Sequence, residues 1–502
     1  MNADTHTLCL GDLLKRADAA HADLRVSGIA YDSRRVQPGD LFFALTGVKA
    51  DGAQFAAQAI RNGAVAVVAE RDLNLSVPVV VVENARQAMA DAARRFWGNP
   101  DRMVNMVGIT GTNGKSTVAA GLRHVWQTAG VEAGLIGTLR YEWRNESIVA
   151  QRTTPESPDL IAMLARMRDD HVRQVAIEVS SHAIALDRVW GLHFQGGVYT
   201  NLTRDHLDYH GTLEEYRRVK SLFFSRLSGE RSFAAINLDD PSADFFLRAA
   251  GDVRTIGYSI QDQGADISLV IESHTLTGSR GQIRIGGETY AFASPLWGRF
   301  NHANLAAIAA AAFGSGLSGE AIVAGLGDFH GIPGRMEPVA TSAPFSVFVD
   351  YAHTPDALDA VLSAARPLVS GRLLVVFGCG GDRDRGKRPQ MAQAVERWAD
   401  LIYLTSDNPR SEDPLRIIDD AKKGFSAGTQ FFSEPDRVCA IERSIADAQP
   451  GDAVILCGKG HEETQDIAGV LHQLSDRDTA ARILAARGHA PQTSNGGGSF
   501  PG

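Results

Sequence analysis

The stretch MVNMVGITGTNGKST, residues 103–117, decides how the chain is organised. Its first part is apolar and is typical of a buried parallel strand that ends at Thr110. The glycine-rich loop Gly111–Gly114 follows directly, and the residues from Lys115 onward have a helical pattern. A strand, a glycine-rich loop and a helix in this order predict an α/β domain, with an anion held by loop N–H groups at the helix N-terminus.

This loop is a variant of the P-loop. Lys115 can reach the β- and γ-phosphates of a nucleotide, and a hydroxyl of Ser116 or Thr117 can bind Mg²⁺. At the position where a P-loop has its first glycine the chain has Ile109, with glycines at 108 and 111 instead. An ordinary glycine-rich turn is the alternative, but the complete series favours ATP. The predicted ATP contacts here are Gly111, Thr112, Asn113, Gly114, Lys115, Ser116 and Thr117.

Composition narrows the class of protein. A chain of 502 residues is long enough for two to four domains, and its 44% hydrophobic and 22% charged residues are typical of globular proteins. Its 50 glycines suit tight strand-to-helix turns. The net charge of −9, from 50 basic and 59 acidic residues, argues against a general electrostatic grip on nucleic acid.

The chain is also expected to work in a reducing compartment without crossing a membrane. No apolar run reaches about 18 residues, and the acidic N-terminal region does not resemble a signal peptide. The four cysteines, at positions 9, 379, 439 and 457, lie far apart without metal-ligand spacing. We therefore expect a cytoplasmic enzyme.

The pattern of apolar runs predicts an α/β protein of three domains. The first block has β-like runs at Ala64–Ala69 and Val77–Val82 and a helix over Ala85–Trp97, which Gly98-Asn99-Pro100 ends. The expected segments are a small N-terminal α/β domain (1–98), a central P-loop-type parallel-sheet ATPase domain with a small antiparallel subsheet (99–333), a C-terminal Rossmann-like doubly wound domain (334–488) and a disordered tail (489–502).

Apolar runs in the second and third blocks give the expected strands. Those of the second block are 103–110, Val175–Val179, Gly197–Leu202 and Ala234–Leu238, with antiparallel strands within Gly251–Pro295 and a helix over Asn301–Phe313. Those of the third block are Val347–Asp350, Leu373–Gly378, Leu401–Ser406 and Ala453–Cys457.

Acidic and imidazole groups follow the strands of the second block. Glu178 ends one strand, where ligands bind in parallel sheets, and it suits Mg²⁺, although a surface acid has the same pattern. Thr200–His210 follows the next strand and is crowded with possible metal ligands. Thr212–Glu215 is a capping box that opens a helix.

Lys220 lies on the apolar stripe of that helix, together with Leu213, Tyr216, Phe223 and Leu227. A lysine that snorkels at the margin of the stripe is one interpretation. The other is a desolvated amine whose pKa is low enough for carbamylation by CO₂.

Polar loops follow the strands of the third block at Asp350–Pro355, Gly378–Arg388, Asp407–Arg410 and Gly458–Glu462. The carboxyl ends of parallel strands meet at one edge, so these loops should converge. Their guanidinium groups and carboxylates suit a zwitterionic amino acid. Any one of these loops, taken alone, could be a solvent-exposed loop without a binding role.

Several motifs together resemble the Mur ligases: Thr110–Thr117, Glu178–His182, Thr200–Gly211, Asn301–Asn304, Gly334–Glu337, Asp350–Pro355 and Asp407–Arg410. The resemblance covers roughly residues 25–485. It implies an ATP-dependent amide-bond ligase of cytoplasmic peptidoglycan precursor synthesis, which adds meso-2,6-diaminopimelate to UDP-N-acetylmuramoyl-L-alanyl-D-glutamate through an acyl phosphate. Mg²⁺ would be the cofactor and ATP a co-substrate. We expect a monomer whose partners are these small molecules only.

The resemblance also implies roles for individual residues. Catalysis falls to Lys115, Glu178, His206 and a carbamylated Lys220, with Ser116, Glu178, His206 and the carbamate as metal ligands. ATP would further contact Asn301, Asn304, Arg335 and Asp350. The UDP-muramoyl-dipeptide would lie on Tyr31, Ser33, Val48, Lys49, Ala50, Arg152, Thr153, Thr154, Ser180 and Arg188. The diamino acid would bind Arg383, Asp407, Asn408, Pro409, Arg410, Gly458 and Glu462.

This chain departs from the pattern of its relatives at Leu186, where they often have an amide side chain, and at Arg152, where they often have Asn. The choice of diaminopimelate has a physical reason, since Arg410 can bind the second carboxylate that lysine lacks. Alternatives are a lysine-adding Mur ligase, a folylpolyglutamate synthase and a nucleotide-dependent switch. A dehydrogenase is disfavoured because no strand is followed by Gly-x-Gly-x-x-Gly with a later acid.

Overall fold

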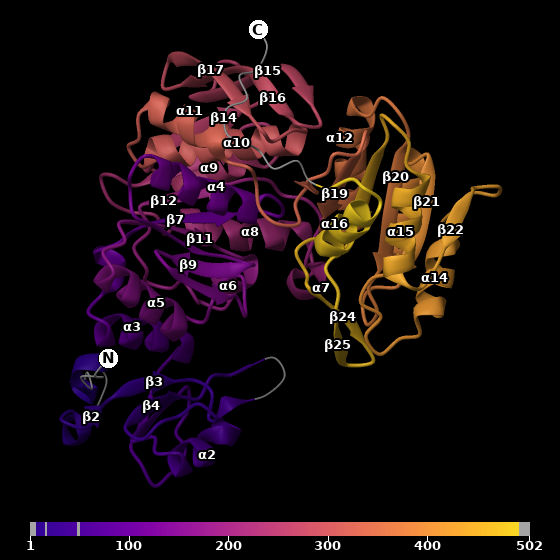
Figure 1. Ribbon diagram of the computed structural model, residues 1–502. Helices are drawn as coiled ribbons and strands as arrows, with labels where there is room; N and C mark the ends of the chain where they lie inside the picture. Colours follow the sequence, from indigo (N-terminus) through magenta and orange to yellow (C-terminus); the bar gives the residue numbers. More distant parts are fainter. Residues whose placement is uncertain (1–6, 16–17, 48–50, 491–502) are drawn as a thin grey trace. The chain divides into compact units, whose positions relative to one another are not determined.

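The computed structural model describes residues 7–15, 18–47 and 51–490 (Figure 1). These residues form two compact units. The first holds the described residues up to Val270 together with Gly281–Phe292 and Ala303–Phe329. The second holds Ile271–Arg280, Ala293–His302 and the described residues from His330 onward. The predicted substrate contacts Val48, Lys49 and Ala50, and residues 491–502 of the predicted tail, lie outside the described residues. The domain boundaries at 98 and 333 stay predictions.

The N-terminal sheet is parallel, with strand order β3-β4-β5-β6. Its strands are β3 Gly28–Ala30, β4 Asp40–Phe43, β5 Ala66–Ala69 and β6 Val79–Val81, beside the antiparallel pair β1 Leu8–Cys9 and β2 Arg25–Val26. The helices of this region are α1 Leu10–Leu13, α2 Ala56–Arg61 and α3 Ala85–Phe96, with 3-10 turns at Ala19–His21, Gly52–Phe55 and Pro100–Arg102. The predicted strands and helix of the first block are confirmed by β5, β6 and α3.

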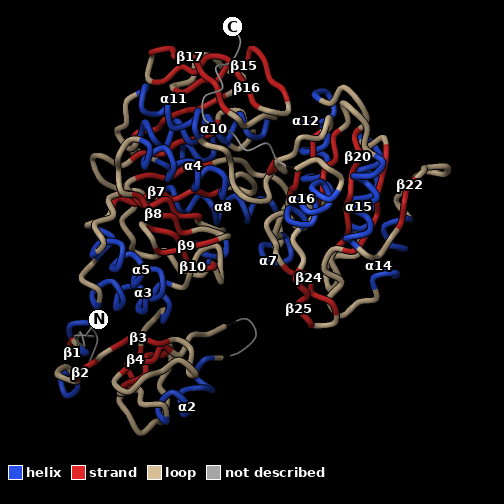
Figure 2. The backbone as a smooth tube through the Cα atoms, viewed as in Figure 1, coloured by secondary structure: helices blue, strands red, loops and turns tan. Residues whose placement is uncertain are grey.

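The central sheet has the order β10-β9-β8-β11-β7-β12-β13-β14-β15-β16-β17. Figure 2 labels β7, β8, β9 and β10 in one part of this sheet and β15, β16 and β17 at its other edge. From β8 to β15, neighbouring strands run parallel. Crossover helices join most of these strands, as a parallel sheet requires. The predicted strands of the second block are confirmed. The parallel strands are β7 Asn105–Thr110, β8 Ala133–Ile136, β11 Gln174–Glu178, β12 Gly196–Tyr199, β13 Phe233–Asn237, β14 Arg254–Ser259 and β15 Ile267–Thr275.

Antiparallel strands extend both edges of this sheet. At one edge β8 pairs with β9 Arg140–Trp143, which pairs with β10 Glu146–Val149. The sequence analysis did not predict this edge. At the other edge, β15, β16 Gly278–Ile285 and β17 Glu288–Ser294 are joined by two-residue connections, which only antiparallel strands allow. The predicted antiparallel strands are therefore present, and they continue the central sheet.

Helices cover the faces of the central sheet. Gly121 of α4 lies where a Cβ would come within 2.3 Å of the Ile308 side chain on α10, so glycine lets these two helices pack closely. The helices are α4 Lys115–Thr128, α5 Ser157–Asp169, α6 Ser181–Ala185, α7 Leu207–His210, α8 Leu213–Phe224, α9 Ala243–Ala250, α10 Arg299–Gly314 and α11 Gly319–Asp328. The expected helix over Asn301–Phe313 is confirmed by α10.

The C-terminal sheet has the order β18-β19-β23-β20-β21-β22 and is parallel except for β18. The apolar strands expected in the third block form its centre, and helices cover it (Figure 1). The elements are β18 Glu337–Pro338, β19 Ser346–Asp350, β20 Leu373–Cys379, β21 Leu401–Ser406, β22 Phe431–Ser433, β23 Ala453–Cys457, the hairpin β24 Thr464–Ile467 and β25 Val470–Gln473, a 3-10 turn at Arg366–Leu368, and the helices α12 Pro355–Ala365, α13 Lys387–Trp398, α14 Pro414–Lys422, α15 Arg437–Asp447 and α16 Asp476–Ala486.

Candidate functional site

The glycine-rich loop lies between β7 and α4, as the sequence predicts. Gly111 and Gly114 have φ values of 150° and 86°, a region that favours glycine. A Cβ on Gly111 would lie 1.9 Å from the Thr200 hydroxyl oxygen, and one on Gly114 would lie 2.4 Å from the Asn304 side-chain oxygen. The loop is therefore packed directly against the end of β12 and against α10. A side chain at either glycine would collide with these neighbours.

Two lysines meet at the carbonyl oxygen of Gly111. Lys115 Nζ donates to it at 3.0 Å and Lys220 Nζ at 2.8 Å. Lys220 is 1% exposed, so the stripe predicted to be buried is buried. Burial, with the charge of Lys115, sets the pKa of Lys220 well below its usual value. Of the two interpretations drawn from the sequence, this burial favours the desolvated amine over a lysine at the margin of the stripe. Its Nζ lies 4.6 Å from the centre of the Tyr216 ring.

Ser116 and Glu178 come together from α4 and the end of β11. The Ser116 hydroxyl donates to Glu178 Oε2 at 3.0 Å. Thr138 holds the same carboxylate with its backbone N–H at 2.8 Å and its hydroxyl at 3.0 Å. The Thr138 hydroxyl oxygen also lies 3.1 Å from the Thr153 hydroxyl, from which it can accept. Glu178 is 2% exposed, and its hydrogen bond from Ser116 orients the carboxylate toward the start of α4. Thr138 is a contributor that the sequence analysis missed.

His206 lies in a group of aromatic rings beside this loop. Its ring centre is 5.0 Å from that of His182 and 6.2 Å from that of Tyr216, the residue beside Lys220. His210 is 2.9 Å from the Ser181 hydroxyl. Among the described residues, no group of three or more His, Cys, Asp or Glu side chains forms a ready-made metal cluster. The metal-binding roles of His206 and Glu178 stay predictions.

Three arginines surround the buried carboxylate of Glu156. Arg152 Nη1 lies 2.6 Å and Arg188 Nε 3.0 Å from one oxygen, and Arg86 of α3 lies 3.0 Å from the other. Burial lowers the pKa of Arg188 despite the attraction of Glu156. Arg188 also donates to the carbonyl of Thr154 at 3.1 Å. The cluster carries more positive than negative charge, so it suits an anionic ligand.

The predicted muramoyl-peptide residues adjoin this cluster. The Thr154 hydroxyl donates to the Glu178 carbonyl at 2.7 Å and accepts from the Ser180 N–H at 3.1 Å. In the N-terminal region, Tyr31 hydrogen-bonds Asp159 of α5, and Ser33 donates to Gln58 at 3.0 Å. Arg152, Thr153, Thr154, Ser180 and Arg188 are therefore brought together, and Tyr31 reaches α5, the helix that Glu156 precedes.

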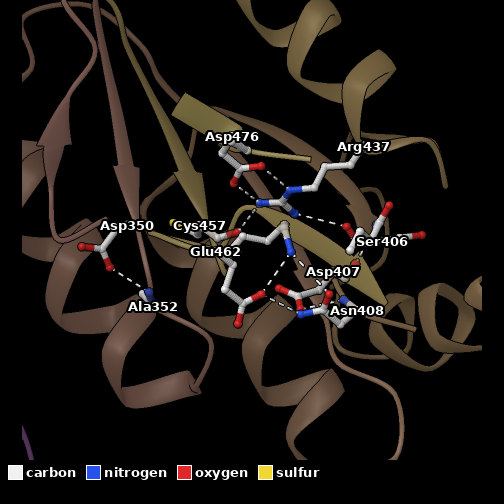
Figure 3. Close-up of polar contacts among 12 residues, drawn as sticks. Asp350, Ala352, Ser406, Asp407, Asn408, Arg437, Cys457, Glu462 and Asp476 are labelled. Atoms are coloured by element: carbon white, nitrogen blue, oxygen red, sulfur yellow. Dashed lines mark hydrogen bonds and ion pairs between the residues drawn. The ribbon is translucent and has the colours of Figure 1, made fainter. Parts of the chain in front are cut away.

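The second unit contains three further predicted ATP residues, Asn301, Arg335 and Asp350. Asp350 ends β19, and its carboxylate accepts from Ala352 N–H at 2.8 Å (Figure 3). It also accepts from Met336 N–H at 2.7 Å. Burial raises its pKa, against the charge of Arg335. Arg335 stacks 4.8 Å from the centre of the Tyr351 ring. Asn301 donates to the Trp297 carbonyl at 3.0 Å. Asn304, by contrast, belongs to the first unit, beside Gly114.

The loops after β21 and β23 join at the carboxyl edge of the C-terminal sheet, as predicted. Asn408 Nδ2 donates to Glu462 Oε2 at 2.7 Å (Figure 3). Lys459 Nζ donates to the same oxygen at 3.0 Å. The loop after β20 reaches them too, because Arg410 Nη1 donates to the Gly381 carbonyl at 2.7 Å and Gly381 N–H donates to the Asn408 carbonyl at 2.9 Å.

Ion pairs that the sequence analysis did not predict support these loops. Arg388 of α13 is 1% exposed and lies 2.7 Å from Glu412 and 3.0 Å from Asp420. Hydrogen bonding to Arg388 lowers the pKa of Glu412 to about 2. Arg437 and Asp476 form a second pair, with both side chains fully buried. A basic residue and an acidic residue far apart in sequence leave no spacing signal, so only the fold reveals these pairs.

Comparison with known protein families finds three Mur ligase models that match successive parts of the chain. The models described as Mur ligase family, catalytic domain, Mur ligase middle domain, and Mur ligase, glutamate ligase domain match residues 25–97, 109–312 and 334–460. A Solibacter usitatus protein named UDP-N-acetylmuramoyl-L-alanyl-D-glutamate–2,6-diaminopimelate ligase is 43% identical over 472 residues, which cover 93% of this chain and 95% of the relative.

Solved structures of Mur ligases have a fold similar to that of this chain. One of a ligase with the same name has a TM-score of 0.73 and 34% identity, over 96% of this chain and 100% of that one. A Thermotoga maritima MurF ligase in complex with ADP shares the fold, with a TM-score of 0.61 and 18% identity over 91% of this chain and 97% of that one. In the described part of this chain, no helix is both long and apolar enough to cross a membrane.

Proposed function

The chain belongs to the Mur ligase family, and we propose that it is the ATP-dependent ligase that adds meso-2,6-diaminopimelate to UDP-N-acetylmuramoyl-L-alanyl-D-glutamate. The observation that carries this proposal is the convergence of Asn408, Arg410 and Glu462 in a chain that is 43% identical to a ligase of that name. The reaction would supply peptidoglycan precursors. A cytoplasmic location and a monomeric state are parts of the proposal that rest on the sequence.

The first step is phosphoryl transfer from ATP to the γ-carboxylate of the D-glutamyl residue, which gives an acyl phosphate and ADP. The N–H groups of Gly111–Lys115 and the helix α4 N-terminus suit the phosphates. The Lys115 amine donates hydrogen bonds to the carbonyls of Gly111 and Thr112. When ATP binds, it would donate to phosphate oxygens in place of these carbonyls. The ADP complex of the related fold supports nucleotide binding by this architecture.

The residues present fit a magnesium ion. Ser116 and Glu178 offer oxygen donors 3.0 Å apart beside the phosphate loop. Mg²⁺ is usually held by one or two carboxylates together with phosphates and water, so a complete protein cage is not required. When bound, it would neutralise charge on the phosphate groups. Thr138 would keep the Glu178 carboxylate oriented.

Carbamylation of Lys220 is part of the same proposal. An amine attacks CO₂ only in its neutral form, and the burial of Lys220 favours that form. The nitrogen would form a bond to the carbon of CO₂ while one C=O π bond opens, and it would release one proton to solvent. The product is an anionic carbamate beside Tyr216 and the glycine-rich loop. The negative charge of the carbamate would then attract Lys115 or the metal ion. His206 would be a further ligand of the metal ion.

In the second step, the amine of diaminopimelate attacks the acyl phosphate, and the tetrahedral intermediate expels phosphate to form the amide. Arg152 and Arg188 would bind the anionic muramoyl dipeptide. The arginines around Glu156 outnumber its single negative charge, and the net positive charge would attract the anion. Asp407, Asn408, Arg410 and Glu462 would hold the charged groups of the amino acid, and exclusion of water would protect the acyl phosphate.

Phosphate release tests this function. We expect release from ATP only when UDP-muramoyl-dipeptide and diaminopimelate are both present. With ¹⁸O in the γ-carboxylate, one labelled oxygen should appear in the released phosphate, because the acyl phosphate transfers it. Release without the amino acid acceptor, or phosphate free of label, would contradict the proposed reaction.

A further inference from the structure

A fully buried ion pair lies beneath the loops assigned to the amino acid. Arg437 opens α15 and Asp476 opens α16, and both side chains are 0% exposed. The guanidinium donates through Nε to Asp476 Oδ1 at 2.7 Å and through Nη2 to Oδ2 at 2.6 Å (Figure 3). This two-point contact fixes the plane of the guanidinium group.

The remaining donors of Arg437 reach the main chain of two strands. Nη1 donates to the Ser406 carbonyl at 3.2 Å and Nη2 to the Cys457 carbonyl at 2.9 Å. Ser406 is the last residue of β21, and Cys457 is the last residue of β23. These strands are not neighbours, because β20 lies between them in the sheet. One side chain therefore links two strand ends that the sheet ladder does not join directly.

The residues that follow these two carbonyls form the amino-acid site. Asp407–Arg410 continues from β21, and Gly458–Glu462 continues from β23. The loops meet closely at Gly458, where a Cβ would lie 2.5 Å from Asp407 Oδ2 and 3.9 Å from Arg437 Nη2. Beyond that point Asn408 and Lys459 both contact Glu462. A shift of either strand end would change the distance between these side chains.

A contribution to the stability of the fold does not by itself explain why this ion pair is buried here. Buried ion pairs often contribute little to stability, because the cost of desolvation offsets the attraction, and apolar side chains of similar volume can replace them. An apolar replacement would, however, leave the carbonyls of Ser406 and Cys457 without these donors.

We propose that the Arg437–Asp476 pair is a positioning element, which sets the distance between the Asp407–Arg410 and Gly458–Glu462 loops and thereby the affinity for the diamino acid. The part about the amino acid rests on the proposed function. Arg437 does not contact the substrate itself; it acts through the main chain of residues 406 and 457.

Arg437→Lys tests this proposal, because lysine keeps the charge beside Asp476 but cannot bridge both carbonyls. Arg372→Lys is the matched control. Arg372 pairs with Asp452 at 2.7 Å, at the opposite ends of β20 and β23, away from the site. Arg437→Met with Asp476→Leu is the second variant, which removes both charges and leaves no unpaired charge buried.

We expect the KM for diaminopimelate to rise at least 10-fold in both Arg437 variants, while the KM values for ATP and UDP-muramoyl-dipeptide stay within twofold. Arg372→Lys should leave all three within twofold. Equal KM values for diaminopimelate in folded Arg437→Lys and wild type, or a parallel rise of all three constants, would overturn the proposal.

Amide hydrogen exchange provides a readout that does not need activity. Peptides spanning 407–410 and 458–462 should exchange at least 10-fold faster in Arg437→Lys than in wild type, and at the wild-type rate in Arg372→Lys. Unchanged exchange in both loops would overturn the positioning role. If wild type itself releases no phosphate with diaminopimelate, the proposed function fails, and this exchange measurement still decides whether the pair positions the loops.

Discussion

Replacement of Lys220 by methionine should separate stability from activity. The lost hydrogen bond from Nζ to the Gly111 carbonyl is worth about 0.5–1.5 kcal/mol net. No carbonyl is left unsatisfied, because Lys115 Nζ still donates to the same oxygen at 3.0 Å. The apolar methionine also avoids the cost of desolvating an amine that is 1% exposed. We therefore expect the free energy of unfolding to change by less than about 1.5 kcal/mol.

Ligase activity should nevertheless fall by at least about 100-fold in Lys220→Met, because the variant lacks the amine that forms the carbamate. Denaturant unfolding gives the stability and phosphate release gives the activity. In wild type, ¹³C-labelled bicarbonate should produce a carbamate signal in the NMR spectrum, and Lys220→Met should lack it. Arg218→Met, on the exposed face of the same helix, is the control, and we expect it to retain stability and activity.

Full activity in folded Lys220→Met would refute the assigned role. A loss of more than about 4 kcal/mol of stability would instead refute the reasoning about the shared carbonyl, since it would mean that the amine is needed for the fold.

Three further predictions concern other parts of the chain. Arg410→Met should reduce the preference for diaminopimelate over lysine at least about 100-fold in competition assays, since a site built for a polar group strongly rejects analogues that lack it; an unchanged preference would contradict the assignment. Glu178→Gln keeps an acceptor for Thr138 N–H but loses the charge, so the concentration of Mg²⁺ for half-maximal activity should rise at least about 10-fold, and equal Mg²⁺ titrations would count against the metal site. Burial lowers the pKa of His302 from 6.5 to about 4, so the unfolded state takes up a proton first as the pH falls. Stability should drop by up to about 3 kcal/mol from pH 6.5 to pH 4, and denaturant unfolding of His302→Gln should lack that dependence.

The sequence predicts what depends on local pattern. The strand, glycine-rich loop and helix around Gly111–Gly114, the burial of Lys220 and the place of Asp350, Asp407 and Gly458 at strand ends all follow from local sequence pattern and from the geometry of parallel sheets. Such features involve neighbours in the chain, or a rule that applies to every strand of a sheet, and so the structure confirms them.

Contacts between distant residues could not be predicted in this way. Arg86 meets Glu156 across 70 positions of the chain, and Arg437 meets Asp476 across 39. None of these four residues lies in a recognisable motif. Charged residues outside motifs are usually exposed to solvent, so the sequence gives no reason to expect them buried. The antiparallel strands β9 and β10 were also missed, because each has only four residues and β10 is exposed along its whole length, although the alternation in Arg140–Trp143 is typical of a strand.

The most direct test of the central claim is mass spectrometry of the product formed with ATP, Mg²⁺, UDP-N-acetylmuramoyl-L-alanyl-D-glutamate and equal concentrations of meso-diaminopimelate and lysine. We predict one new uridine nucleotide, whose mass corresponds to addition of diaminopimelate with loss of water, together with stoichiometric ADP. A product that contains lysine, or ADP formed without any ligated product, would contradict the account.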